Sequence, residues 1–346
     1  MPLYEGILSH VMSGLSFVEA KDDLDISDIK KILASPNITR IQTRGPLTTT
    51  TWRLINEALL PVRPNISIRI YNNFGEVCDF SFLEHLTNVR DFTANGLMEA
   101  KNYQAFSNLQ KLERLKLSIY KLPDISFLDL INEGVTEIGL FKSSSKKPDL
   151  KVLERFKELV KLSIQGHRKN LEHIKKLVSL RNLSLSGLTI DDPRFLYDIQ
   201  HLKSLSLDLI NHESLDHMRE LDNVESLAVS EIRNLENTDF LTGFKGLKSL
   251  HLDCLNRVEA LPSLGCSESI EEITLRDLKL LKNVSFIQGC KKLKSFTYTG
   301  KNTIPVKDFE VVAKLPSLKE ARIGTGSSKR NDQIQGIMEN HSIQMA

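Results

Sequence analysis

The chain has 346 residues, more than the roughly 100–200 residues of an ordinary single-core domain, so it forms either two globular domains or one elongated repeat. Lys and Arg number 46 against 44 acidic residues, a net charge of +2. This balance argues against a dedicated nucleic-acid binder, which needs a concentrated basic face. No stretch approaches the roughly 18 uninterrupted apolar residues of a membrane helix. The first residues lack the basic and apolar regions of a secretory signal.

Four cysteines occur, and their spacing is unlike that of a zinc site or a disulfide framework. They are Cys78, Cys254, Cys266 and Cys290, and no CxxC pair is present. We therefore expect a soluble protein of a reducing compartment, with a cytoplasmic location.

In chain order, an L-x-x-L-x-L pattern recurs from near the beginning almost to the end. Looser copies start at Leu15, Ile38, Asn65 and Val89. Regular copies, 21 to 25 residues apart, start at Leu112, Val135, Leu159, Leu180, Leu202, Val224, Leu247, Ile270, Leu293 and Leu318. In each copy the apolar fourth and sixth positions alternate with polar neighbours, which is typical of a strand with one buried face. The sequence therefore predicts about fourteen strand-bearing units.

A second kind of segment precedes many of these strands. Examples are DFSFLEHLTNV at 79–89 and TDFLTGFKGL at 238–247, whose apolar residues recur every three to four positions. That spacing indicates a helix or a turn of 3₁₀ helix. One such unit cannot bury its own apolar face, whereas stacked units build a parallel sheet on one face and helical segments on the other.

These repeats resemble those of leucine-rich-repeat proteins along nearly the whole chain. Repeat length and the x-F-L-x-x-L segment resemble most the roughly 22-residue subclass of bacterial internalins and phosphatase-regulating repeat proteins. The resemblance implies an α/β fold, a leucine-rich-repeat solenoid. In such a solenoid a curved parallel sheet forms the concave face, and helices or 3₁₀ turns form the convex face.

Two columns of the repeat are informative beside that resemblance. The family's ninth position is usually Asn, but here Leu and Ile occupy it, so we expect the loop backbone groups to pair with backbone or water. Seven residues before the strand pattern, Phe82, Phe195, Phe240 and Phe286 resemble a phenylalanine spine. His173 and His217 occupy the same slot, and we expect them to replace Phe in the core.

The repeats organise residues 1–346 as a single solenoid. We expect an N-terminal cap in 1–14, repeats in 15–323 and a C-terminal cap in 324–346, because terminal repeats lack a neighbour. The step between Ile38 and Asn65 is longer and predicts a fuller helix, beneath which Trp52 packs.

Motifs for catalysis or metal binding are weak. His212 and His217 are five residues apart, whereas a zinc-protease helix needs a spacing of four. GTGSSKR at 324–330 lacks the spacing of a phosphate loop. The sequence predicts no enzyme activity, no cofactor and no metal.

The register of the repeat names the exposed strand residues, since positions 2, 3, 5 and 7 should point to the concave face. These positions are basic near the amino terminus, small and uncharged in the middle, and mixed or acidic later. Arg and Tyr are enriched among residues that dominate binding energy. We expect partner contacts from Arg40, Arg44, Arg69, Tyr71, Arg114, Lys116, Phe141, Asp208, His251, Asp253 and Arg276.

The resemblance implies a non-catalytic scaffold that binds a protein through its concave face. The gradient of charge favours a partner that is acidic in part, and an immunity-like inhibitor or an adaptor is the specific role we expect. We expect neither a nucleic-acid nor a membrane partner, and the oligomeric state stays open. Two alternatives remain: nucleic-acid binding through Arg40, Arg44, Arg69 and Arg114, and a hydrolase whose carboxylates converge across strands.

Overall fold

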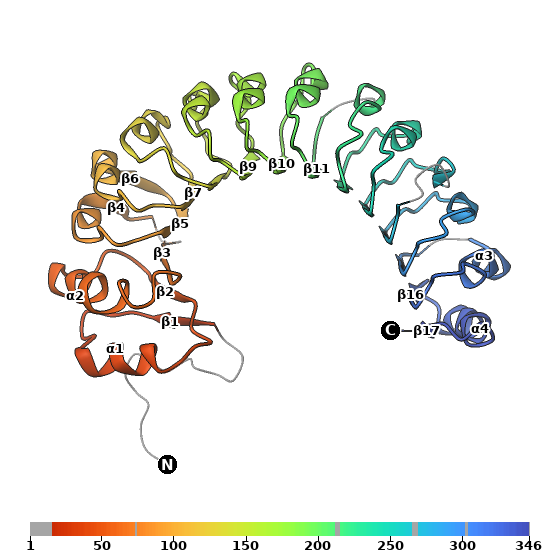
Figure 1. Ribbon diagram of the computed structural model, residues 1–346, viewed down its shortest axis with the longest axis horizontal. Helices are drawn as coiled ribbons and strands as arrows, with labels where there is room; N and C mark the ends of the chain where they lie inside the picture. The colour runs from red at the N-terminus through yellow and green to blue at the C-terminus, as the bar shows by residue number, and fades with distance from the viewer. Residues whose placement is uncertain (1–15, 73–74, 212–214, 265–268, 302–303, 346) are drawn as a thin grey trace, which may run out of the picture. The chain divides into compact units, whose positions relative to one another are not determined.

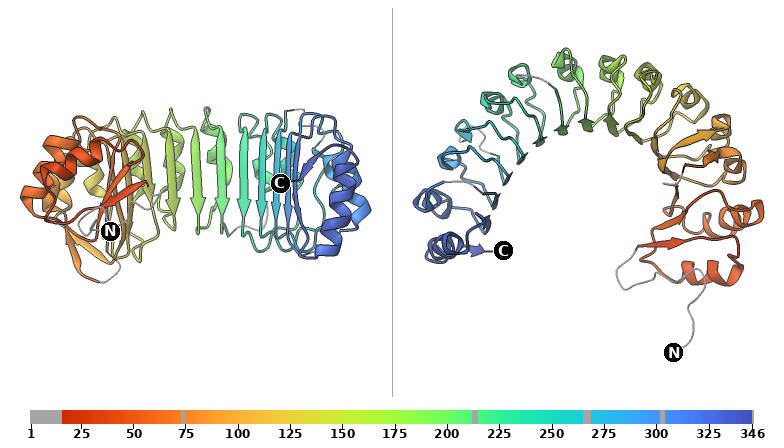
Figure 2. Two further views of the ribbon diagram at one scale, coloured as in Figure 1. Left: turned by 90° about the horizontal axis from the view of Figure 1, so that it is seen from below. Right: turned by 180° about the vertical axis from the view of Figure 1, so that it is seen from behind.

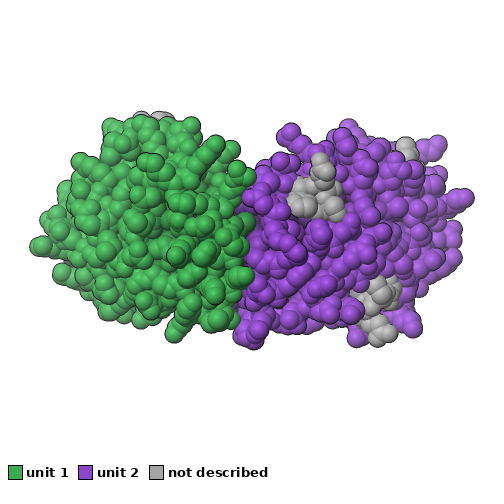
Figure 3. Space-filling view, turned by 90° about the horizontal axis from the view of Figure 1, so that it is seen from above, with its two compact units in different colours: residues 1–179 green, residues 180–346 purple. Residues whose placement is uncertain are grey.

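The computed structural model describes residues 16–72, 75–211, 215–264, 269–301 and 304–345. The chain divides into two compact units, Met1–Ser179 and Leu180–Ala346 (Figure 3). The expected N-terminal cap at 1–14 and the repeat start at Leu15 lie outside the described residues. In the part of the chain that is described, every helix is too short or too polar to cross a lipid bilayer.

Parallel strands form the backbone of both units, and each of them except β17 begins two residues after a predicted repeat start. In unit 1 their order is β1 (Phe17–Glu19), β2 (Arg40–Thr43), β3 (Ser67–Tyr71), β5 (Asp91–Leu97), β7 (Arg114–Ile119), β8 (Glu137–Leu140) and β9 (Lys161–Gln165). In unit 2 it is β10 (Asn182–Ser186), β11 (Ser204–Asp208), β12 (Ser226–Ser230), β13 (Ser249–Asp253), β14 (Glu272–Arg276), β15 (Ser295–Thr299), β16 (Glu320–Gly324) and β17 (Gln344–Met345).

Helical segments connect the strands, and most are short 3₁₀ helices of three to six residues. The α-helices are α1 (Ile26–Leu33), α2 (Thr49–Leu54), α3 (Glu310–Ala313) and α4 (Ser328–Glu339). The 3₁₀ segments are η2 (Phe80–His85), η3 (Tyr103–Asn108), η4 (Ser126–Leu130), η5 (Leu150–Arg155), η6 (Leu171–Lys176), η7 (Pro193–Asp198), η8 (Asp216–Met218), η9 (Asp239–Gly243), η11 (Ser285–Ile287) and η12 (Val306–Phe309). A second, two-stranded sheet pairs β4 (Val77–Asp79) with β6 (Glu99–Lys101).

Within each unit the main strands lie side by side on one side, here called the strand face, and the helical segments lie on the opposite side (Figures 1 and 2). The predicted repeat architecture is therefore confirmed in both units.

The pairing register places the apolar positions in the core, as the repeat pattern predicts. Leu183 lies opposite Leu205, and Leu185 lies opposite Leu207, and at most 2% of any of these side chains is exposed. Because side chains alternate along a strand, the intervening position 5 faces the other way. The predicted register of the repeat is confirmed.

The longer step between Ile38 and Asn65 contains the predicted fuller helix. Helix α2 continues into the π-helical segment η1 (Ile55–Leu59). Trp52 is completely buried, and its ring stacks on Phe82 with 4.9 Å between the ring centroids. Trp52 therefore stabilises the core beneath this helix, as predicted.

The ninth-position column is buried, and a turn of the backbone before it explains how. The buried residues are Leu97, Leu188, Ile210, Ile232, Leu255 and Leu278. The eighth position adopts a positive φ in successive repeats: Gly187 (61°), Leu209 (51°), Glu231 (53°), Cys254 (53°) and Asp277 (48°). In these repeats the left-handed backbone turns the chain at the end of the strand, directly before the buried apolar residue.

The eighth position also supplies the hydrogen bonds that an asparagine column would otherwise make. The N–H of Leu209 donates to the carbonyl of Ser230 at 3.1 Å, and the N–H of Glu231 donates to that of Asp253 at 3.1 Å. Gly187, Cys254, Asp277 and Gly300 donate in the same way to the following repeat. The N–H groups of these loops thus donate to backbone carbonyls, which is one of the two outcomes expected from the sequence, namely pairing with backbone or with water.

The expectation that His173 and His217 replace phenylalanine in the core is wrong. Phe82, Phe195, Phe240 and Phe286 are buried as predicted. His173, however, is only half-buried, and its Nδ1 bonds the Glu154 carboxylate. His217 is exposed, and its neighbour Met218 fills the interior instead. An imidazole needs polar partners, so it stays where a carboxylate or water can reach it. His212 lies outside the described residues.

The C-terminal segment 324–346 contains the expected helix and an additional strand. Ile334 and Met338 on α4 are fully buried, whereas Ile337 is only half-buried. After α4, β17 pairs with β16 in the same parallel register. The last turns therefore continue the stack by one short strand.

Placing a charged side chain at a buried strand position tests the predicted register of the repeat. Leu205→Asp should abolish cooperative unfolding, because Leu205 is 1% exposed and an unpaired buried carboxylate costs several kcal/mol. Ser204→Asp, one residue earlier on the opposite face, should change the free energy of unfolding by no more than about 0.5 kcal/mol. Circular dichroism melts measure both variants, and a Leu205→Asp protein with an unchanged melting temperature would refute the register.

Two glycine-to-alanine changes test the eighth-position turn. Gly187→Ala should destabilise unit 2 by roughly 1–2 kcal/mol, because Gly187 has a φ of 61°. Gly336→Ala should stabilise it by roughly 0.5–1 kcal/mol, because Gly336 lies inside α4 with open space around an added methyl group. Urea denaturation measures both, and equal signs would contradict the structural role of the left-handed column.

Candidate functional site

The predicted contact residues fall into separate groups in the two units. Unit 1 carries Arg40, Arg44, Arg69, Tyr71, Arg114, Lys116 and Phe141, and unit 2 carries Asp208, His251, Asp253 and Arg276. Each group is built from strands paired in register, so residues distant in sequence become neighbours.

The first group gathers around Tyr71 at the ends of β1, β2 and β3. Glu19, Gln42 and Arg69 stand side by side in the pairing register of these strands. The Tyr71 hydroxyl donates to Glu19 Oε1 at 2.9 Å, and Gln42 Nε2 donates to Glu19 Oε2 at 2.9 Å. Arg69 Nη1 donates to Gln42 Oε1 at 3.0 Å, and its guanidinium carbon lies 5.0 Å from the centre of the Tyr71 ring. The side chains of this network are held before any partner arrives.

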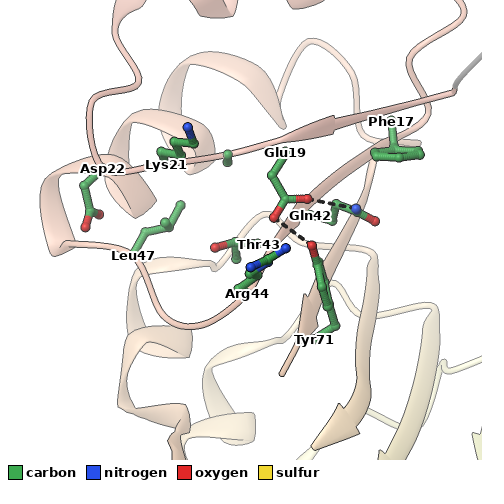
Figure 4. Close-up of a pocket in the computed structure, with 10 residues that line it drawn as sticks. Phe17, Glu19, Lys21, Asp22, Gln42, Thr43, Arg44, Leu47 and Tyr71 are labelled. Carbon is green, nitrogen blue, oxygen red and sulfur yellow. Dashed lines mark hydrogen bonds between the residues drawn. The ribbon is translucent and has the colours of Figure 1, made fainter. Parts of the chain in front are cut away.

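Beside this network is a pocket of about 600 Å³ (Figure 4). Its lining comprises Phe17, Glu19, Ala20, Lys21, Asp22, Gln42, Thr43, Arg44, Leu47 and Tyr71. Figure 4 shows Arg44 next to the Tyr71 hydroxyl and the Glu19 carboxylate. Interaction with Tyr71, and more weakly with Glu19, raises the pKa of Arg44 above its ordinary value. We call the residues Arg44, Arg69 and Tyr71 with this pocket the Tyr71 site.

Two further predicted cations of unit 1, Arg114 and Lys116, are engaged with carboxylates. Arg114 Nε lies 2.9 Å from Asp91 Oδ2. Lys116 Nζ lies 2.9 Å from Glu137 Oε1, and Lys161 approaches the same oxygen at 3.4 Å. Against partial burial, these two lysines hold the pKa of Glu137 below its ordinary value. The strip that sequence reasoning regarded as basic is therefore neutralised at Arg114 and Lys116.

The other two unit 1 residues lie apart from these ion pairs. Arg40 is exposed, and its Nε lies 3.4 Å from the Ser67 hydroxyl. Phe141 covers Gly139: a Cβ added at Gly139 would lie 3.3 Å from the Phe141 ring and 3.2 Å from Lys116 Cγ. Glycine at this position lets the ring and the lysine stem occupy the surface.

In unit 2, Asp208 lies at the centre of a row of serines. Ser186 Oγ and Ser230 Oγ, from the strands on either side, each donate to Asp208 at 2.8 Å. Each carboxylate oxygen of Asp208 thus accepts a hydrogen bond from a serine hydroxyl, so the side chain is held between its two neighbouring strands.

The second predicted group is looser. His251 Nε2 lies 3.8 Å from Asp253 Oδ2, and Arg276 is exposed on the strand directly opposite Asp253. Asp253, Cys254 and Asp277 bring potential metal ligands within 4.8 Å of one another. However, the hydrogen bond to Asp253, together with burial, raises the pKa of the Cys254 thiol to about 11. The thiolate that a soft metal needs is therefore disfavoured.

A hydrolase built on paired carboxylates would need one acid with a raised pKa. Among the residues that the structure describes, every carboxyl group with a shifted pKa is shifted downward. Within these residues, no carboxyl group with a raised pKa supports the hydrolase alternative.

The sequence analysis did not include Glu19 and Gln42 in the predicted contact residues, although both stand at position 5 of their repeats and pair with each other in register. It also missed a charge ladder at position 2 of unit 2. Lys203 and Lys248 bond the two oxygens of Glu225 at 2.8 and 2.7 Å, and Lys294 bonds Glu271 at 2.6 Å. The two lysines lower the pKa of Glu225 to about 2. The signal was the alternation of Lys and Glu at one repeat position.

Comparison with known proteins shows the fold of the chain. No protein-family model and no curated protein matches it. Among solved structures, the internalin InlF of Listeria monocytogenes has a TM-score of 0.54 at 15% identity, covering 92% of this chain and 93% of that one. A leucine-rich-repeat protein of Leptospira interrogans has 0.52 at 15%, covering 91% of each. A chain of the Toll–Spätzle complex of Drosophila has 0.51 at 15%, covering 89% of this chain and 43% of that one.

Removing the carboxylates that pair with Arg114 and Lys116 tests the nucleic-acid alternative. Asp91→Asn with Glu137→Gln should release Arg114 and Lys116, so that binding of a labelled oligothymidylate appears at low salt. The slope of log affinity against log salt should steepen by about 1.4, from roughly 0.7 for each of two neutralised phosphates. Fluorescence anisotropy across a salt series measures it. Asp129→Asn with Glu158→Gln, both exposed, is the charge-matched control. Steep salt dependence in the unaltered protein would instead restore the nucleic-acid alternative.

Proposed function

Since the chain folds as a leucine-rich-repeat solenoid like the internalins, we propose that it is a non-catalytic scaffold that binds a protein through its strand face. One observation supports this most. The alternate apolar residues of each strand are used in the core, while a continuous row of polar side chains within each unit stays at the surface. Such a row provides many contact points for a protein partner.

The Tyr71 site is the part of the strand face best suited to bind tightly. Arg and Tyr are enriched among the residues that dominate binding energy. Here the Tyr71 hydroxyl and the Arg69 guanidinium are already hydrogen-bonded, through Glu19 and Gln42, so less side-chain freedom is lost on association. His251, Asp253 and Arg276 in unit 2 form the second candidate contact.

The role within a cell is a further part of the proposal. A leucine-rich-repeat fold occurs in the Toll–Spätzle complex, an assembly of two proteins. By analogy with such scaffolds, we propose an immunity-like inhibitor or an adaptor whose partner is acidic in part. A reducing compartment such as the cytoplasm suits the free Cys78 and Cys254.

Loss of Arg69 and Tyr71 tests the scaffold. The partner is first identified by affinity capture with mass spectrometry from the native host and then purified. Arg69→Ala with Tyr71→Ala should weaken its dissociation constant by at least about 30-fold, because a dominant contact residue contributes about 2 kcal/mol or more. The melting temperature should change little, since both side chains are half-exposed.

Thr297→Ala with Arg322→Ala, a neighbouring pair on unit 2, serves as the control and should leave binding unchanged. His251→Ala with Arg276→Ala provides the comparison. If the substitutions of His251 and Arg276 weaken binding and those of Arg69 and Tyr71 do not, the contact surface lies on unit 2. If neither pair has an effect, the strand face is not the binding surface.

A further inference from the structure

The carboxylates and the amide that line the pocket of the Tyr71 site already take part in hydrogen bonds within the protein. Each oxygen of Glu19 accepts one hydrogen bond, from Tyr71 or from Gln42. Asp22 Oδ1 accepts from the backbone N–H of Thr48 at 2.6 Å. The Gln42 side chain both donates and accepts. A cationic guest would therefore compete with these existing hydrogen bonds at Glu19 and at Asp22 Oδ1.

The pocket has unused hydrogen-bond donors, and they belong to the Arg44 side chain. The Arg44 guanidinium offers five N–H groups and is exposed. Within the described residues Arg44 forms no ion pair with a carboxylate at 4.0 Å or less, unlike Arg114 and Lys116, which do. The neighbouring Tyr71 hydroxyl is held by its hydrogen bond to Glu19, so Arg44 lies beside a tyrosine side chain whose position is fixed.

The charge around the pocket favours an anion. Lys21 and Arg44 balance Glu19 and Asp22 within the lining. Arg69, stacked on the outer face of the Tyr71 ring, adds one positive charge beside it. The surplus is small, so it favours a single carboxylate rather than a polyanion.

The rest of the pocket wall is apolar. Phe17 and Leu47 are each half-buried, which leaves part of their apolar surface open to the pocket. Ala20 and the Tyr71 ring complete this wall. A volume of about 600 Å³ accommodates one bulky side chain together with its neighbour, within the roughly 300–1,000 Å³ of ordinary ligand pockets.

We propose that this pocket anchors a partner segment in which an Asp or Glu side chain stands next to a bulky apolar residue. The carboxylate binds the Arg44 guanidinium through two parallel N–H···O bonds, the geometry that an arginine fork provides. The apolar neighbour packs on Leu47, while Phe17 lies at the opposite end of the lining (Figure 4). This inference rests on the proposed scaffold function and names the chemistry that the strand face recognises.

Two labelled peptide pools test the inference. Both pools carry a Leu, Phe or Met followed by a fixed residue, which is Glu in one pool and Gln in the other, with mixed residues around this pair. By fluorescence anisotropy the unaltered protein should bind the Glu pool at least tenfold more tightly. Arg44→Gln should remove this preference, and Arg44→Lys should restore it only in part because an ammonium cannot bind in the two-pronged way. Leu47→Ser should weaken binding of both pools.

The matched control is Arg322→Gln, an exposed arginine on a strand of unit 2, which should keep the full preference. The proposed binding of an acidic side chain by Arg44 would be overturned by any of three results. These are equal binding of the two pools, no binding of either pool, and a preference for Glu that survives Arg44→Gln. A phosphoserine pool that binds more tightly than the Glu pool would also overturn it, because the guest would then be a phosphorylated segment. The scaffold proposal is judged separately, by the affinity of the purified partner for the Arg69 and Tyr71 variant.

Discussion

Burial of alternate strand residues between neighbouring repeats is the interaction on which the rest of this protein depends. Leu183 and Leu205, or Leu185 and Leu207, contact each other because their strands pair in exact register. A single repeat has nowhere to bury these side chains, so its stability is supplied by its neighbours. The same alternation directs the intervening residues outward. The core therefore decides which residues are left for binding.

The left-handed eighth position is the second constraint, and it follows from the first. An apolar residue at position 9 can enter the core only if the chain turns sharply just before it. Leu209, Glu231 and Cys254 accept a positive φ that is unfavourable for side chains with a Cβ. The compensation is local: their N–H groups bond carbonyls of the next repeat, and a buried apolar residue follows. This protein closes its turns with backbone where its better-known relatives use asparagine.

The same pairing of neighbours shapes the binding surface. Asp91 and Glu137 occupy Arg114 and Lys116, and the serines beside Asp208 satisfy its carboxylate. Charges that seem free in a one-dimensional column are thus partly used between adjacent strands. What remains is uneven: Arg44 keeps unused donors next to a prearranged tyrosine, while the carboxylates of its pocket are engaged. Recognition by this protein depends on such residual groups rather than on the overall charge of a strip.

The amino-acid sequence by itself determined the repeat, its register, the buried leucine and phenylalanine columns and the position of the longer helix around Trp52. Each of these follows from periodicity, and periodicity is written along the chain. The tertiary structure alone decided which neighbour satisfies each polar group. The pairing of Glu19 with Tyr71 joins residues 52 positions apart, and the exposure of His217 depends on Met218 filling the interior. Hydrogen bonds and ion pairs act over a few ångströms in space, so only the stacked repeats reveal which donors remain free.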